Sequence, residues 1–330
     1  MRFAIWLKKE KMNEVCVVVY TCNRPDDLKR CLDSLLRQTY SHYKIMAVNN
    51  SADLLTRQIL AERKITAIND QTKRLSYLFN LGWKNSPCEY IAYLADDAEV
   101  DPQWLFFGME SFKRHPEAAV VTGPFISASN YTGEMHVLHD AAQKNPVLRR
   151  LVGFYENFVM EGKPFAPGRL FASGAYSLGQ GFEPTSSREL EVDLATTSCM
   201  LIRRSALLKV NGFDEDFIFN HADGDLFVRL KKNGYKIIYN PRMRGVHYNR
   251  LGPSRYPFFI GRDTAFFYLK NIRPGSVKGV LAEMINIAVL NLYWVYKTVE
   301  TRNPRQLAGI YGFFRGILDY LFRKGRNKIR

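Results

Sequence analysis

The first half of the chain alternates between short apolar runs and segments whose apolar residues recur at helical spacing. Residues 14–20 form an almost continuous apolar run, which is typical of a strand buried on both faces of a parallel sheet. A helix is predicted to start at Pro25, with apolar positions at Leu28, Cys31, Leu32, Leu35 and Leu36. Repetition of these two signals predicts an α/β fold with right-handed crossovers.

The same periodicities predict the remaining elements of this domain. Further strands are expected over residues 44–48, 65–68, 90–94, 119–121, 195–202 and 236–239. Further helices are expected over residues 54–62, 76–83, 205–210 and 225–233, with another starting at Pro102. Residues 125–194 follow neither period and are rich in Gly, Ser, Pro and aromatic residues, so we expect an ordered, irregular region that binds a ligand.

Composition indicates a globular protein with a sizeable core, because 46% of its 330 residues are hydrophobic and 24% are charged. The five cysteines include no C-x-x-C pair, which favours reduced thiols in a cytosolic protein over a disulfide framework or a zinc site. Residues 1–14 place too few apolar residues before a charged cluster for a signal peptide. No apolar run reaches 18 residues, so we do not expect a conventional spanning helix.

The positive charge is concentrated at the C-terminal end of the chain. The net charge is +15, and residues 270–330 carry 12 Lys and Arg against three Asp and Glu. A nucleic-acid enzyme more often spreads its basic residues around the reaction site, so we expect no nucleic acid and predict a tail with its own partner. Residues 280–296 are apolar but contain Glu283, Asn286 and Asn291, which favours packing or an interface over a membrane span.

Residues 310–329 mix aromatic and aliphatic residues with arginine and lysine, which is the composition of a helix lying on an anionic membrane surface. The alternative is a helix packed on the preceding domain with a solvated basic end. We therefore divide the chain into an α/β domain over residues 1–265 and a basic, apolar helical extension over residues 266–330.

The first candidate site is the acidic segment at residues 93–102. A predicted strand ends at Asp96 and Asp97, and Pro102 starts the next helix. Ligands of open α/β sheets bind at the carboxyl ends of the strands, where carboxylates can hold a divalent cation that also takes diphosphate oxygens. The alternative is that these acids only cap the following helix.

A second acidic segment begins at Asn211. It contains Asp214, Glu215 and Asp216, and then Asp223 and Asp225 at the start of a predicted helix. An aspartate in such a position commonly caps its helix. A cap alone does not require a second acidic cluster with a neighbouring histidine, His221, so a functional role is the favoured interpretation.

Together these segments resemble glycosyltransferase family 2, whose members have the GT-A fold, a Rossmann-like nucleotide-diphospho-sugar transferase domain. The resemblance covers about residues 13–265 and is carried by residues 17–25 with 35–40, 48–51, 96–97 with 104–105, and 212–215 with 223–230. The run over residues 247–254 and the Gly261-Arg262-Asp263 tripeptide look like the rhamnosyl- and galactofuranosyltransferase branch.

The resemblance implies roles for individual residues. Thr21 and Arg24 would lie near the base and ribose of the nucleotide, with Asn49 opposite the base. Arg74 and Asn80 would reach the ribose and sugar, and Arg262 the departing diphosphate. Asp97, with Asp96, would take the metal-binding D-x-D position for Mn²⁺ or Mg²⁺, and His247 would be a further ligand. Asp223 would be the catalytic base, and Asp225 would hold neighbouring groups.

Three positions depart from the family pattern. Asn49 stands where the family usually has Asp, which should weaken a base or ribose contact. Ala95 occupies the first D-x-D position, which leaves the metal to Asp96, Asp97 and His247. Ala222 replaces the usual Glu before the base, which affects acceptor orientation.

The resemblance implies an inverting, metal-dependent glycosyltransferase, and the basic, apolar tail predicts a cytoplasmic protein at the inner face of the cell membrane. It would move a hexose or deoxyhexose from a UDP- or dTDP-sugar to a hydroxyl group of a cell-surface glycan or its lipid-linked precursor. Inversion needs one carboxylate as base and positive charge on the leaving diphosphate. Two alternatives stay open: direct transfer to a polyprenyl phosphate, and a binding protein without turnover. A P-loop and a G-x-G-x-x-G motif are absent after the first strand, which argues against NTPases and dehydrogenases.

Overall fold

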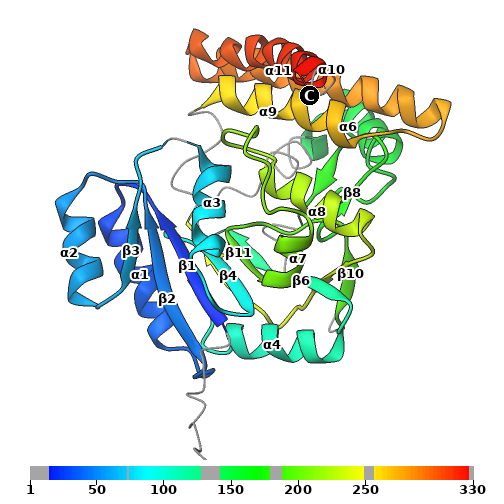
Figure 1. Ribbon diagram of the computed structural model, residues 1–330. Helices are drawn as coiled ribbons and strands as arrows, with labels where there is room; N and C mark the ends of the chain where they lie inside the picture. The colour runs from blue at the N-terminus through cyan, green and yellow to red at the C-terminus, as the bar shows by residue number, and fades with distance from the viewer. Residues whose placement is uncertain (1–14, 73, 128–141, 179–187, 249–255, 327–330) are drawn as a thin grey trace, which may run out of the picture.

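The computed structural model describes residues 15–72, 74–127, 142–178, 188–248 and 256–326. A mixed eight-stranded sheet forms its centre (Figure 1). From edge to edge its strands are β10 (Leu190–Val192), β12 (Lys236–Tyr239), β6 (Ala118–Thr122), β11 (Cys199–Arg203), β4 (Tyr90–Ala95), β1 (Val15–Thr21), β2 (Tyr43–Asn49) and β3 (Thr66–Asn69). Strands β4, β1, β2 and β3 run parallel, whereas β11 is antiparallel to both of its neighbours.

Helices cover both faces of this sheet, and the sequence of β1 shows why. Val15, Val17 and Val19 point into one core, and Cys16 and Val18 point into the other, because successive side chains alternate across a strand. The first core is closed by α1 (Pro25–Leu36), α2 (Leu54–Glu62) and α4 (Trp104–Arg114). The second is closed by α3 (Leu75–Lys84), α7 (Arg204–Lys209), α8 (Ala222–Lys232) and α9 (Pro257–Asn271).

Two small sheets flank the large one. One joins β5 (Ala98–Val100), β13 (Gly245–His247) and β7 (Phe125–Ser127), and brings the 247 region beside the end of β4. The other pairs β8 (Arg169–Leu170) with β9 (Tyr176–Ser177). Both sheets draw on the segment over residues 125–194, which the sequence left without regular elements.

A layer of helices lies at one end of the molecule, on the side shown uppermost in Figure 1. It contains α9, α10 (Val277–Thr301), the short 3-10 helix η2 (Pro304–Leu307) and α11 (Ala308–Arg326), with α6 (Pro146–Phe158) projecting beside α10. Helix α9 runs through the expected boundary at residue 265, so no element ends there and the division into two domains stays a prediction. In the described part of the chain, α10 is long and apolar enough to cross a membrane, judged by length and composition alone.

Most predicted elements are confirmed, with shifts at their ends. The predicted strand over residues 195–202 starts later, at Cys199, because residues 194–198 line a cavity instead. Helix α6 was missed altogether. Five sequence segments considered above lie outside the described residues: 1–14, 128–141, 179–187, 249–254 and 327–330.

Candidate active site

Parallel strands bring the predicted nucleotide and metal residues to one edge of the sheet. Thr21 at the end of β1 is paired with Asn49 at the end of β2, and Tyr20 is paired with Ala95 at the end of β4. Asp96 and Asp97 follow directly, and the Asp96 N–H donates to the carbonyl oxygen of Tyr20. The carboxyl ends of three adjacent strands therefore converge where ligands bind in open α/β sheets.

Arg24 joins the two acids. Its guanidinium forms ion pairs with both carboxylates, with 2.8 Å between Nη1 and Asp97 Oδ2 and 3.2 Å between Nε and Asp96 Oδ2. Asp96 is fully buried and Asp97 nearly so. Burial raises the pKa of Asp96 to about 6, and the charge of Arg24 acts in the opposite direction. The resemblance placed Arg24 near base and ribose, whereas its contacts are with the acid pair.

His247 reaches the other oxygen of Asp97. Its Nε2 lies 3.2 Å from Asp97 Oδ1, and its ring stacks on Phe125 at a centroid distance of 4.6 Å. The pairing of β13 with β5, which aligns His247 with Ala98, holds this arrangement in place. The structure therefore brings Asp97 and His247, two of the three residues that the resemblance implied as metal ligands, into contact, and Arg24 links Asp96 to Asp97.

The donors at this position fit a cation shared with a substrate. Among the residues that the structure describes, no group of three or more His, Cys, Asp or Glu side chains is arranged to hold a metal. Asp97 and His247 nevertheless offer an oxygen and a nitrogen side by side. Mg²⁺ and similar cations are often bound through one or two protein ligands and the phosphates of a substrate. Asp96 is less available, because its carboxylate accepts from Arg24 and from the Cys22 N–H.

Asn49 and Asn80 are engaged inside the protein. Asn49 is buried, donates to Asn69 Oδ1 over 2.9 Å and accepts from the Ser51 N–H. The amide of Asn80 donates to the Phe213 carbonyl and Glu215 Oε1, and its oxygen accepts from the Phe213 N–H. Asn80 therefore fixes the Gly212–Glu215 turn against α3. The donor-binding roles of Asn49 and Asn80 stay predictions.

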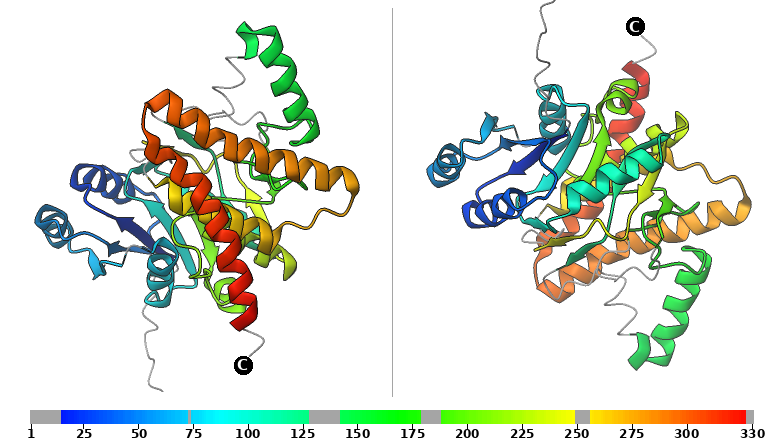
Figure 2. Two further views of the ribbon diagram at one scale, coloured as in Figure 1. Left: turned by 90° about the horizontal axis from the view of Figure 1, so that it is seen from above. Right: turned by 90° about the horizontal axis from the view of Figure 1, so that it is seen from below.

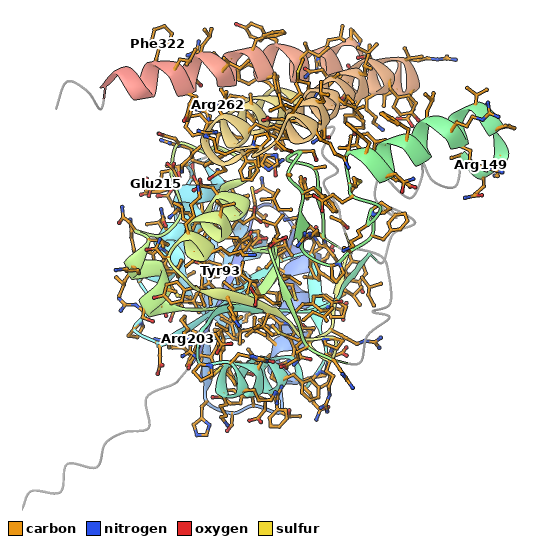
Figure 3. The ribbon with its side chains drawn as sticks, turned by 90° about the vertical axis from the view of Figure 1, so that its right-hand side faces the viewer. Tyr93, Arg149, Arg203, Glu215, Arg262 and Phe322 are labelled. Atoms are coloured by element: carbon orange, nitrogen blue, oxygen red, sulfur yellow. The ribbon has the colours of Figure 1, made fainter. Side chains whose placement is uncertain are left out.

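Arg74 and Arg262 do not join the acid pair. Arg74 is exposed and donates to the Glu215 carbonyl oxygen. Arg262 is paired with Asp263 at 2.7 Å and with Asp319 of α11 at 2.9 Å. Figure 3 shows it at the junction between the catalytic domain and the helical layer. Its contact with the diphosphate stays a prediction, and the ion pairs with Asp263 and Asp319 count against it because they already occupy the guanidinium.

A cavity of about 250 Å³ lies between β1, α3, α8 and α9. Its lining includes Asp223, and it combines aromatic rings with small polar groups: Tyr20, Phe79, Tyr176, Phe219, Phe267, Thr197, Ser198 and His221. Tyr20 and Ser198 connect it to the acid pair, because their hydroxyl groups are hydrogen-bonded at 2.9 Å and Ser198 O accepts from the Ala95 N–H. The cavity thus begins beside the strand ends that carry Asp96 and Asp97.

Asp223 and Asp225 lie only two residues apart but have different surroundings. Asp223 is half-buried in the cavity wall, and its carboxylate accepts from the N–H groups of Gly224 and Thr197. Burial raises its pKa above the ordinary value, and those N–H groups act in the opposite direction. A half-buried carboxylate with a raised pKa is suited to accept a proton.

Asp225 is completely buried and bound by cations. It accepts from Lys270 Nζ at 2.6 Å, Arg229 Nε at 2.8 Å and Asn271 Nδ2 at 3.0 Å. These contacts tie the first turn of α8 to the end of α9. The geometry is that of a residue that positions α8.

Sequence reasoning gave Asp263 no role, yet it shapes the cavity. Its Oδ2 accepts three backbone N–H groups, from Ile218, Phe219 and Asn220, at 2.7–3.0 Å. Phe219 and Asn220 both line the cavity. The sequence around Asp263 could not have revealed this role, because the loop that it anchors lies more than 40 positions away.

His221 occupies the position next to the missing acid at Ala222. Its φ is 58°, in the left-handed region, and its ring stacks on Phe267 with Nε2 3.1 Å from Thr264 Oγ1. Burial lowers its pKa to about 4, so the ring is neutral at pH 7. These contacts favour a structural role for His221 rather than replacement of the missing carboxylate.

Comparison with known proteins identifies the family. The family described as Glycosyl transferase family 2 matches residues 16–210, more than half of the chain. The chain belongs to glycosyltransferase family 2. The matched region contains β1, the acid pair and β11, so it includes the sheet edge where Thr21, Asn49 and Asp96 meet. The family membership expected from the sequence is confirmed.

Two of the proteins that the chain resembles are named as rhamnosyltransferases. The chain is 38% identical over 256 residues to the N-acetylglucosaminyl-diphospho-decaprenol L-rhamnosyltransferase of Mycobacterium tuberculosis, covering 73% of this chain and 78% of that protein. It is 23% identical to the rhamnosyltransferase WbbL of Escherichia coli over 71% of this chain and 83% of that protein. It is also 27% identical to the O-antigen biosynthesis protein RfbC of Myxococcus xanthus over 71% of this chain, but spans only 17% of RfbC.

Solved structures confirm the GT-A fold of the chain. The mannosyltransferase PcManGT from Pyrobaculum calidifontis, in complex with GDP-Man and Mn²⁺, superposes with a TM-score of 0.56 at 13% identity, covering 93% of this chain and 88% of that one. GalNAc-T7 with UDP, GalNAc and Mn²⁺ gives a TM-score of 0.56 at 14% identity, covering 78% of this chain and 50% of that one. At these identities the likeness establishes the fold alone.

Proposed function

We propose that the chain transfers a sugar, with L-rhamnose as the first candidate, from a UDP- or dTDP-linked donor to a hydroxyl group of a cell-surface glycan or its lipid-linked precursor. The observation that carries this proposal is Asp223, a half-buried carboxylate with a raised pKa in a cavity beside the acid pair. The names of the Mycobacterium tuberculosis and Escherichia coli relatives support a rhamnosyl donor.

In the proposed mechanism the acceptor hydroxyl lies in the cavity and Asp223 accepts its proton as the oxygen attacks the anomeric carbon. Attack from the side opposite the diphosphate inverts the configuration of that carbon. The aromatic walls of the cavity exclude water and offer apolar surfaces to a sugar ring, while Thr197 and Gly224 hold the carboxylate in place. Asp225 and Asp263 act as positioning residues.

The leaving diphosphate needs positive charge, and we propose two sources for it. Arg24 lies against both acids and adds a fixed cation at the strand ends. Mn²⁺ or Mg²⁺, held by Asp97 and His247, would supply a second charge to stabilise the diphosphate. The Mn²⁺ in both related structures supports this choice of metal.

The metal proposal predicts that Asp97→Ala loses most of its Mn²⁺-dependent transfer and its Mn²⁺-dependent gain in donor affinity. Transfer and donor binding are measured with Mn²⁺ and with excess EDTA, beside an Asp33→Ala control on the outer side of α1, where Asp33 pairs with Arg63. Wild-type transfer that is unchanged in excess EDTA contradicts the metal role.

The donor is tested by thermal unfolding with a panel of nucleotide-sugars. A donor present at 100 times its Kd should stabilise the protein by about 2.7 kcal/mol. Stabilisation by a donor without either transfer or hydrolysis would support the alternative of a binding protein, which the alanines at positions 95 and 222 suggested. Stabilisation by no nucleotide-sugar would contradict the proposed function.

A further inference from the structure

The outer face of α10 is apolar. Its exposed large hydrophobic residues form two groups, each with members three or four positions apart, and their exposed fractions lie between 42% and 79%: Val277, Val280, Leu281 and Met284, then Leu292, Val295, Tyr296 and Val299. The inner face carries the polar contacts instead. Asn286 is buried, donates to Tyr268 Oη and accepts from Tyr155 Oη. The buried face also holds Ala282 and Trp294, so α10 has apolar residues on both faces, whereas the outer face of a helix on a soluble protein is usually polar.

Helix α11 continues this apolar surface. Gly312 and Gly316 lie against α9, where a Cβ at Gly312 would stand 2.0 Å from the Phe258 carbonyl oxygen and one at Gly316 2.2 Å from the Arg262 carbonyl oxygen. This close backbone contact fixes which side of α11 faces outward. The outward residues are Tyr311, Phe314, Leu318, Leu321 and Phe322, with Leu307 from η2. Figure 3 shows Phe322 pointing away from the protein.

Helix α6 adds a third element on the same side of the molecule. Its C-terminal half packs on α10, where Tyr155 Oη donates to Asn286 Oδ1 over 2.6 Å. Its N-terminal half projects beyond α10, as the left view of Figure 2 shows. One turn apart on this helix, Val147, Leu151 and Phe154 are more than half exposed.

Basic residues accompany these apolar surfaces. Residues 146–158 and 277–326 together contain ten Lys and Arg against four Asp and Glu. Two of those four acids are already neutralised, because Glu300 pairs with Lys297 and Asp319 pairs with Arg262 and Arg315. In contrast, Arg149 and Arg150 on α6 are exposed. The surface therefore combines apolar side chains with a net positive charge.

We propose that the outer faces of α6, α10 and α11 form one docking face for the interface of an anionic lipid bilayer. Apolar helices with arginine and lysine at their margins bind such interfaces by burying side chains among the acyl chains and attracting anionic headgroups. A second copy of the chain fits less well, because a two-fold contact would bring the same positive charges together. Spanning by α10 would break the bonds of Asn286. The docking face lies outside the candidate active site, so this proposal stands or falls independently of sugar transfer.

The test measures binding of the intact protein to sedimented vesicles of phosphatidylcholine, with and without phosphatidylglycerol. We expect binding to the anionic vesicles, weakening as salt increases. Leu151→Ser/Phe154→Ser in α6 and Phe314→Ser/Leu318→Ser in α11 should each lower the partition coefficient by at least about tenfold, because each removes two large apolar side chains. Leu54→Ser/Leu208→Ser is the matched control, since these residues are 76% and 55% exposed on α2 and α7.

Each result decides part of the proposal. Wild-type protein that leaves anionic vesicles unbound at low salt overturns it, as does equal loss of binding in the control. Normal binding by the α6 variant removes α6 from the docking face. Resistance of bound protein to alkaline extraction contradicts an interfacial position, and self-association without lipid that the α11 variant abolishes identifies a second copy as the occupant. Thermal unfolding of every variant checks that its fold is retained.

Discussion

Replacing Asp225 with asparagine should lower the free energy of unfolding more than replacing Asp223 does, and should slow sugar transfer less. The buried carboxylate is held by Lys270 and Arg229, and the substitution leaves both cations without that charge. Breaking a fully buried ion pair costs about 3–5 kcal/mol. The two cationic side chains are 23% and 22% exposed, and Lys270 keeps Asp214 at 2.6 Å, so solvent and this second partner reduce the loss. We expect a decrease of about 2–3 kcal/mol in the free energy of unfolding.

Urea unfolding of the wild type, Asp225→Asn and Asp223→Asn measures this difference. Asp223→Asn should cost only about 1 kcal/mol, because Thr197 and Gly224 donate to different oxygens of the carboxylate and the single amide oxygen keeps one of these two hydrogen bonds. Transfer by folded Asp225→Asn, measured well below its unfolding temperature, should fall less than transfer by Asp223→Asn. An Asp225→Asn variant with wild-type stability and no transfer would refute the positioning role.

Two further predictions concern His221 and the α9–α11 contact. The pKa of His221 is about 4 in the folded protein and 6.5 in the unfolded chain, so the unfolded chain binds the proton more tightly. The free energy of unfolding should therefore be highest above pH 6.5 and decrease by up to about 3 kcal/mol as the pH falls towards 4. His221→Asn, which tolerates the left-handed backbone, should flatten this part of the curve of unfolding free energy against pH, and an unchanged curve would contradict the assignment. Gly312→Ala should cost about 1–3 kcal/mol because its Cβ meets the Phe258 backbone, whereas Gly275→Ala, with nothing within 4 Å, should be nearly neutral in thermal unfolding. Equal unfolding temperatures for the two glycine variants would show that α11 does not need its close contact with α9.

Periodicity was sufficient to predict seven of the eight strands of the central sheet, and it missed β10 in the irregular region over residues 125–194. The apolar run at residues 14–20 could be buried only between two helix layers, and β1 has side chains in both cores. The parallel pairing of β1 with β2 and β4 then accounts for the meeting of Thr21, Asn49 and Asp96, since parallel strands end at the same edge. The apolar pattern and the rules for connections between parallel strands therefore predict which strand ends meet, without knowledge of side-chain contacts.

Contacts between distant segments were beyond the sequence. Asp223 and Asp225 are both in the first turn of α8. Asp225 forms a buried ion pair with Lys270 of α9, whereas Asp223 lines the cavity, and this contact with α9 could not be predicted from the local sequence. Arg24 lies 72 positions from Asp96, so no spacing rule predicts their contact. Helix α6 was missed, although Asn145 caps it and Pro146 starts it, because its segment is surrounded by glycine, proline and aromatic residues.

The central claim is that Asp223 is the base of a sugar transfer. Single-turnover transfer by wild type and by Asp223→Asn, with donor affinity measured on the same samples, tests it most directly. We predict donor affinity within a few-fold of the wild type and transfer at least about 10²-fold slower, as expected when general-base assistance is lost. Transfer that persists in Asp223→Asn but is lost in Asp225→Asn would contradict the claim.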